Sequence, residues 1–181
     1  MTIQSIVFGG GCFWCAEAVF RRLKGVISVK PGYAGGRVPN PTYHQICTMD
    51  TGHAEVIRVD FDSDSIDLDT LLSVFFATHD PTTPNRQGND SGPQYRSIIL
   101  CNSEEQASIV KRFIETLEQN KTFSKSIVTE LKPLDTFYEA EEYHKAYYEK
   151  NRDEPYCQFV IDPKVAKLRQ RFSHLLSEEK T

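Results

Sequence analysis

The segment IQSIVFGGGCFWCAEAVFRRLKGVISVKPGY, residues 3–33, sets the first half of the fold. Residues 3–8 are a short apolar run closed by three glycines, which is typical of a buried strand that ends in a turn. Apolar residues then recur at helical spacing until Gly25, where the helix is predicted to end, and residues 26–33 are a second strand candidate. The segment therefore predicts a strand, a turn, a helix and a strand.

The next part of the chain continues with two strands around a helix. Residues 54–61 alternate as a strand does, and Asp67 is placed to cap a helix rich in leucine and phenylalanine. A polar loop over 80–93 precedes a further strand over 95–101. The order strand, helix, strand, strand, helix, strand is the split β-α-β pattern, so we predict an α+β fold, an α/β sandwich with a ferredoxin-like core.

The second half is predicted to be mostly helical. A helix is predicted over 103–120, where Ser103 and Gln106 match a capping box, and a short strand over 127–131. Thr136 and Glu139 form another capping-box match, which opens the next helix. A last helix begins at Asp162, followed by a proline at its first turn.

Length and composition indicate a single domain over 1–181, with a core at about 3–135 and a C-terminal helical segment at about 136–181. The 25 acidic and 21 basic residues give a net charge of −4, which offers no basic surface for nucleic acid. No apolar run is long enough for a membrane span and no basic leader opens the chain, so we expect a cytosolic protein that binds no membrane. In a reducing compartment, any disulfide among the five cysteines is expected to be transient and catalytic.

The segment GGGCFWCAE, residues 9–17, holds the only tryptophan between two of the cysteines. Cys12 is predicted at the first turn of a helix, where free N–H groups and the helix dipole lower a thiol pKa. Cys15 is predicted one turn deeper, where a disulfide to Cys12 needs local unwinding. Two small buried residues or a thioredoxin-like redox pair are the other interpretations. A zinc site lacks a second ligand pair, because the remaining cysteines are single: Cys47, Cys101 and Cys157.

Glu55 is unusual because it shares one face of the strand 54–61 with large apolar residues. Burial there raises a carboxyl pKa and leaves a neutral acid near pH 7, whereas a position at the exposed start of the strand leaves it ionised. Tyr43 and Tyr95 follow turn residues and either present phenols to a pocket or only pack. Asp90, in QGNDSG, is either a site residue or a turn former.

The sequence resembles the A-type peptide-methionine (S)-S-oxide reductases. The resemblance rests on GGGCFWCAEAVF, PGYAGG, NPTYHQIC, TGHAEVIRVDFD, FFATHDPTTPNRQGNDSGPQYRS and AEEYHKAYYEKN, which together span most of residues 5–157. It implies an α+β ferredoxin-like fold and an enzyme that reduces methionine-S-sulfoxide, free or in peptides, and so repairs proteins damaged by oxidative stress.

The resemblance also implies a role for each candidate. Cys12 is the nucleophile that becomes a sulfenic acid, and Glu55 is the acid. Tyr43 and Tyr95 donate to the sulfoxide oxygen. Phe13 and Trp14 hold the methyl group, and Asp90 organises the site through water.

Recycling is implied to use a second thiol and thioredoxin, or dithiothreitol in vitro, with no bound metal or organic cofactor. Cys157 stands where many members carry the resolving cysteine, and Cys15 is the alternative, although many members have glycine at its position. Cys47 and Cys101 are expected to pack in the core. We expect a monomer. A general CxxC thiol-disulfide oxidoreductase and a non-catalytic module that binds oxidised peptides are the competing functions.

Overall fold

The computed structural model describes residues 1–178. Its centre is a six-stranded sheet in the order β7-β6-β1-β3-β2-β8, antiparallel except for the pair β6–β7. A separate hairpin pairs β4 with β5. The strands are β1 (Ile3–Gly9), β2 (Val26–Ala34), β3 (Ala54–Asp62), β4 (Arg86–Gln87), β5 (Asp90–Ser91), β6 (Ile98–Cys101), β7 (Glu130–Pro133) and β8 (Tyr138–Glu139).

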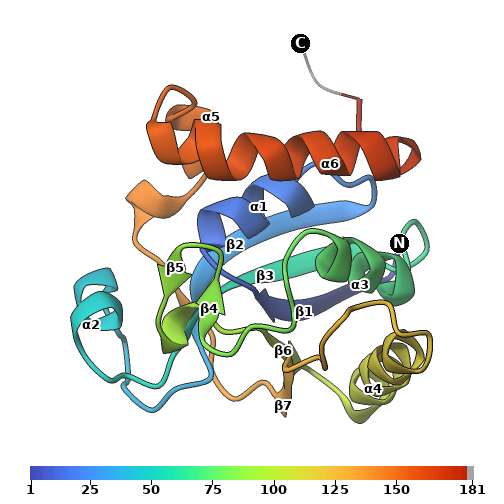
Figure 1. Ribbon diagram of the computed structural model, residues 1–181, viewed down its shortest axis with the longest axis horizontal. Helices are drawn as coiled ribbons and strands as arrows, with labels where there is room; N and C mark the ends of the chain where they lie inside the picture. The colour runs from blue at the N-terminus through green and yellow to red at the C-terminus, as the bar shows by residue number, and fades with distance from the viewer. Residues whose placement is uncertain (179–181) are drawn as a thin grey trace.

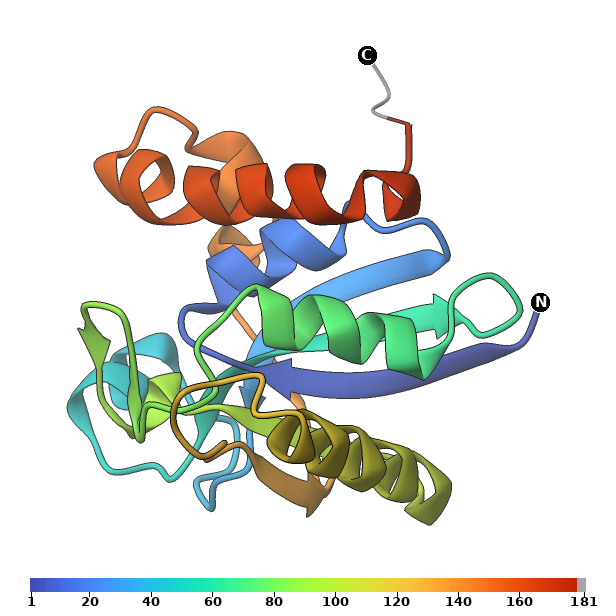
Figure 2. The same cartoon turned by 45° about the vertical axis from the view of Figure 1, so that its right-hand side comes forward.

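Helices cover one face of this sheet, and α6 lies outside α1 (Figures 1 and 2). The order β1-α1-β2-β3-α3-β6 confirms the predicted ferredoxin-like core. The α-helices are α1 (Phe13–Phe20), α2 (Tyr43–Thr48), α3 (Leu68–Ala77), α4 (Glu104–Gln119), α5 (Tyr147–Lys150) and α6 (Asp162–Phe172). Shorter turns are the 3-10 segments η1 (Pro93–Tyr95), η2 (Glu142–His144) and η4 (Ser173–Leu175) and the π-helical segment η3 (Cys157–Ile161).

The core forms where the central strands meet α1 and α3. Phe8 of β1 stacks on Phe20 of α1 and on Phe75 of α3, with ring centroids 5.2 and 4.7 Å apart. Because side chains alternate along a strand, Val7 points to the opposite face and joins a second apolar cluster. Both faces of β1 are therefore buried.

The second face of the sheet is crossed by the chain between β7 and β8, which lie at opposite edges. Leu134 and Phe137 of this connection pack against that face. The crossing carries the C-terminal segment from the β6–β7 edge to the edge beside β2. As a result, residues after 140 reach the end of the sheet where α1 begins.

The structure corrects several predicted boundaries. The helix expected from Thr136 and Glu139 is wrong, because Tyr138 and Glu139 pair with β2 as strand β8, and only η2 and the short α5 follow. The strand expected over 95–101 begins at Ile98, after η1, and the strand expected over 127–131 is β7.

Two further local features differ from the prediction. Helix α2 was not predicted, although Thr42 and Gln45 form a complete capping box at its start. At α4, Ser103 accepts from the Gln106 amide as expected, but the Gln106 side chain accepts from Asn102 instead of Ser103. Among residues 1–178, no helix is both long and apolar enough to cross a membrane.

The predicted cap of α3 is present and can be tested by substitution. Asp67 Oδ1 accepts from the Thr70 amide at 2.8 Å. We expect Asp67→Ala to lower the free energy of unfolding by about 1 kcal/mol, because one N–H group of the first turn loses its acceptor. Asp67→Asn keeps an acceptor oxygen and serves as the matched control in urea denaturation. An equal loss in both variants would contradict the capping role.

Candidate active site

A glycine turn places Cys12 at the start of α1. Gly11 has a φ of +88°, which favours glycine, and a Cβ on Gly10 would lie 2.8 Å from the His79 ring. The Gly11 amide also donates to the Tyr95 carbonyl at 3.1 Å, which ties the turn to η1. Cys12 is the N-cap of α1, with extended backbone angles, and therefore lies just outside the helix.

The pKa of Cys12 differs from the prediction. We expected the helix N-terminus to lower the pKa of this thiol, but Cys12 is only 7% exposed, and burial raises its pKa well above the usual value. A hydrogen bond to Cys15 and the charge of Glu55 act in the same direction. The same hydrogen bond lowers the pKa of Cys15 to about 7. The lowered thiol pKa therefore belongs to the second cysteine of the pair.

Glu55 is buried on the helix-covered face of β3, beside Cys12. Its exposed fraction is 1%. Of the two positions considered from the sequence, buried or at the exposed start of the strand, Glu55 therefore occupies the buried one. Oε1 accepts from the Phe13 amide at 3.2 Å, whereas Oε2 has no hydrogen-bond partner in the described part of the chain. Burial, with the charges of Asp90 and Cys15, raises the pKa of Glu55 to about 8. The carboxyl group is therefore mostly protonated at neutral pH.

Two phenols come from separate elements to the same region. Tyr43 begins α2, and Tyr95 ends η1. Burial raises the pKa of both hydroxyls, and the charge of Glu55 adds to the effect in both. Both side chains thus lie within electrostatic range of Glu55 and remain hydrogen-bond donors at any physiological pH.

Asp90 reaches the cysteine pair through a residue that the sequence analysis missed. The Tyr156 hydroxyl donates to Asp90 Oδ2 at 2.7 Å, and its oxygen lies 3.8 Å from Cys15 Sγ. Tyr156 belongs to the C-terminal segment and Asp90 to the hairpin β4–β5. Tyr156 directly precedes Cys157 in the sequence, and this position was the signal that could have indicated it.

An aromatic wall stands beside Cys12. Trp14 stacks on Tyr147 with ring centroids 3.6 Å apart and planes at 7°, and its indole N–H donates to His144 Nδ1 at 3.0 Å. Phe13, Tyr43 and His144 pack against one another. Sequence reasoning did not single out His144 or Tyr147, because both lie in the segment predicted as an ordinary helix.

Glu141 connects the aromatic residues beside Cys12 to the sheet by hydrogen bonds. Its carboxylate accepts from the Tyr33 hydroxyl and from the Tyr43 amide, each at 3.0 Å. These hydrogen bonds lower the pKa of Glu141 against the opposing effect of burial, which keeps it ionised. The residue fixes the start of α2, and thereby Tyr43, against β2.

The remaining cysteines differ in exposure. Cys157 is fully buried in η3, where the charge of Cys15 contributes to a raised pKa that is caused mainly by burial. Cys101 packs in the core as predicted. The prediction that Cys47 packs in the core is wrong, because this thiol is exposed on α2. Helix α2 buries Ile46 instead, one residue earlier.

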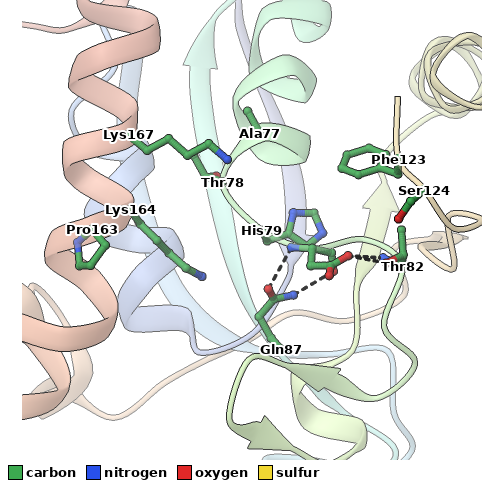
Figure 3. A pocket seen from close by; sticks show the side chains of 11 residues that line it. Ala77, Thr78, His79, Thr82, Gln87, Phe123, Ser124, Pro163, Lys164 and Lys167 are labelled. Carbon is green, nitrogen blue, oxygen red and sulfur yellow. Dashed lines mark hydrogen bonds between the residues drawn. The ribbon is translucent and has the colours of Figure 1, made fainter. Parts of the chain in front are cut away.

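A separate cavity of about 430 Å³ lies between the end of α3 and α6. Figure 3 shows Lys164 and Lys167 extending from α6 into it, opposite Phe123 and Ser124. Lys164 also lines a smaller cavity together with Cys15 and Gly10. Within residues 1–178, no cluster of three or more histidine, cysteine, aspartate or glutamate side chains is placed to hold a metal ion.

A buried thiol pair beside a protonated carboxyl and two phenols, on a ferredoxin-like core, is an arrangement that suits an oxidoreductase acting on sulfur. A family model described as peptide methionine sulfoxide reductase matches residues 4–176. The chain belongs to this family of oxidoreductases, as the sequence resemblance indicated.

Individual relatives agree with this assignment. A peptide methionine sulfoxide reductase MsrA from Sulfolobus acidocaldarius is 59% identical over 170 residues, which are 94% of this chain and 96% of the relative. The reduced form of Mxr1 from Saccharomyces cerevisiae has a TM-score of 0.80 at 34% identity, covering 86% of this chain and 89% of that one. Mxr1 in complex with Trx2 has a TM-score of 0.58 at 26% identity, covering 80% of this chain and 84% of that one.

The raised pKa of Glu55 makes stability depend on pH. A carboxyl whose folded pKa lies near 8 contributes stability that is complete below about pH 4 and is lost as the pH rises through about 8. We expect the free energy of unfolding of the wild type, relative to Glu55→Gln, to fall by a few kcal/mol across that range. Urea denaturation at a series of pH values measures this difference.

The control for loss of one charge is Glu105→Gln, at an exposed position of α4. If wild type and Glu55→Gln kept a constant difference between pH 5 and pH 8, the buried carboxyl would not titrate as described.

Proposed function

We propose that this enzyme reduces methionine-S-sulfoxide, in exposed peptide segments and as the free amino acid, to methionine. The observation that carries the proposal is the protonated Glu55 beside Cys12, with one carboxyl oxygen left without a hydrogen-bond partner. A sulfoxide oxygen is a poor leaving group unless it is protonated, so a neutral buried acid beside a thiol fits this reaction. The family membership of the chain supports the same substrate.

In the first step, Cys12 sulfur attacks the sulfoxide sulfur while Glu55 delivers a proton to the oxygen. The hydroxyls of Tyr43 and Tyr95 stabilise the charge that develops on that oxygen, as an oxyanion hole does. The S–O bond of the substrate and the new bond between the two sulfurs break as the oxygen bonds to Cys12 sulfur, so methionine leaves and Cys12 holds the oxygen as a sulfenic acid. The thiol proton of Cys12 passes to the Glu55 carboxylate and restores the acid. The sulfur of the substrate is reduced by two electrons and the sulfur of Cys12 is oxidised by two.

Substrate recognition in this proposal uses the aromatic wall. Phe13 and Trp14 contact the methyl group, and the stack of Trp14 on Tyr147 holds the indole in place. Asp90 contributes through Tyr156, to which it is hydrogen-bonded, and through water at the site.

Recycling then needs a second thiol and an external dithiol. Cys15 or Cys157 condenses with the sulfenic acid, which releases water and forms a disulfide. A thioredoxin reopens it by exchange. The proposal draws support from the yeast relative Mxr1, which has been crystallised with Trx2. We propose that the enzyme acts as a monomer in the cytoplasm, where its five free thiols stay reduced, and that it repairs oxidised proteins.

Enantiomer selectivity tests the reaction. Incubation of the enzyme with racemic methyl p-tolyl sulfoxide and dithiothreitol should consume the S enantiomer and leave the R enantiomer. Cys12→Ser should abolish turnover, whereas Cys101→Ala, in the core away from the thiol pair, should keep it. Equal loss of both enantiomers, or turnover by Cys12→Ser, would falsify the proposal.

The acid role of Glu55 is tested by single-turnover kinetics. We expect Glu55→Gln to slow sulfide release by about 10²- to 10⁴-fold, because the amide cannot donate a carboxyl proton to the oxygen. The wild-type rate should fall as the pH rises through about 8, and the variant should lack this fall. An unchanged rate in Glu55→Gln would contradict the acid role of Glu55, whereas the absence of sulfide release from the wild type would favour a binding module.

A further inference from the structure

Cys12 and Cys15 are separated by a single hydrogen-bonded turn. The Cys15 amide donates to the Cys12 carbonyl at 3.2 Å, which is the pattern of a turn whose ends lie within about 7 Å. Disulfides need Cα atoms about 4.4–6.8 Å apart. Because Cys12 is the N-cap and not a helical residue, the unwinding expected from the sequence is not required.

The side chains of the pair already meet. Each thiol shifts the pKa of the other, raising that of Cys12 and lowering that of Cys15, so the two side chains lie close together in the reduced protein. An N-cap side chain normally folds back over the first turn toward the third helical residue, which here is Cys15. The geometry for an attack by one sulfur on the other is therefore present at rest.

The surroundings of Cys15 suit an attacking thiol. The Tyr156 hydroxyl lies 3.8 Å from the Cys15 sulfur, and Lys164 lines the same small cavity as Cys15. The positive charge of Lys164 and the hydrogen bonds from Cys12 and Tyr156 favour the thiolate, the form that attacks. Asp90 acts in the opposite direction.

Cys157 is less well placed for the same step. It is fully buried within the π-helical segment η3, so its sulfur is enclosed by its own element and by α1. Burial also raises the pKa of its thiol, which lowers the fraction of thiolate. Cys15 contributes to this shift, which places the two sulfurs within electrostatic range.

We propose that Cys15 is the thiol that condenses with the Cys12 sulfenic acid, so that the first disulfide is Cys12–Cys15 and the C-terminal segment does not have to move. This inference rests on the proposed function, which supplies the sulfenic acid. Cys15 sulfur bonds to Cys12 sulfur, the S–O bond of the sulfenic acid breaks, and the hydroxyl leaves as water with the thiol proton. No further oxidant is required, and Cys157 is not needed to close the bond.

The experiment uses reduced, desalted full-length enzyme and one equivalent of S-methyl p-tolyl sulfoxide, without reductant. Sulfide release and loss of the first titratable thiol report the first step, and loss of a second thiol reports the second. Quenching with N-ethylmaleimide and peptide mapping identify the bonded pair, and dimedone traps any sulfenic acid. The variants are Cys15→Ala and Cys157→Ala, with Cys101→Ala as the matched control.

We expect Cys157→Ala and Cys101→Ala to lose two thiols as fast as they release sulfide and to contain the Cys12–Cys15 bond. Cys15→Ala should release one equivalent of sulfide, accumulate a dimedone adduct on Cys12, and lose a second thiol about 100-fold more slowly than the control. Because sulfide release in the same sample shows that the variant is folded, slow thiol loss reports the missing partner.

The opposite pattern overturns the assignment. If Cys15→Ala closed a Cys12–Cys157 bond at the control rate while Cys157→Ala accumulated the sulfenic acid, Cys157 would be the resolving thiol, and sulfide release would still support the proposed function. If wild type released no sulfide, the proposed function itself would fail.

Discussion

The hydrogen bond from the Phe13 amide to Glu55 joins the first turn of α1 to the start of β3, and the rest of the site depends on it. It anchors one carboxyl oxygen inside the protein and leaves the other free for a ligand. A single amide donor does not offset the desolvation of a full charge, so the carboxyl keeps its proton. Because α1 starts at this bond, Cys12 is held next to an acid by backbone geometry.

The second determinant of the site is the route of the chain across the sheet. Strands β7 and β8 lie at opposite edges, and the connection between them covers the face that the helices leave open. This route delivers His144, Tyr147 and Tyr156 to α1 from the far end of the sequence, and it brings Glu141 to the start of α2. One side of the candidate site is therefore built by the ferredoxin-like core and the other by the C-terminal segment.

Sequence periodicity predicted the features that local pattern determines. The alternation around Glu55 placed it on the apolar face of its strand, and its burial follows from that placement. The capping-box match at Thr136 predicted a helix, but Tyr138 pairs with Tyr33 as part of an edge strand instead. Cys47 was misplaced because a short helix buries one residue, Ile46, and the pattern alone does not say which. Long-range pairing decides both cases, and a single sequence does not display it.

Repulsion among the buried acidic groups determines which of them keep their protons. Glu55, Asp90, Cys12 and Cys15 lie within electrostatic range of one another, and each charge makes the next one harder to form. Lys164 is the cation that favours ionisation at Cys15. In the proposed reaction, the protonated Glu55 supplies the acid for the sulfoxide oxygen, and Cys15, whose pKa is lowered, supplies the thiolate for the step after it. In that reaction the sulfenic acid forms at Cys12, one hydrogen-bonded turn from Cys15, whose lowered thiol pKa favours the thiolate that attacks it.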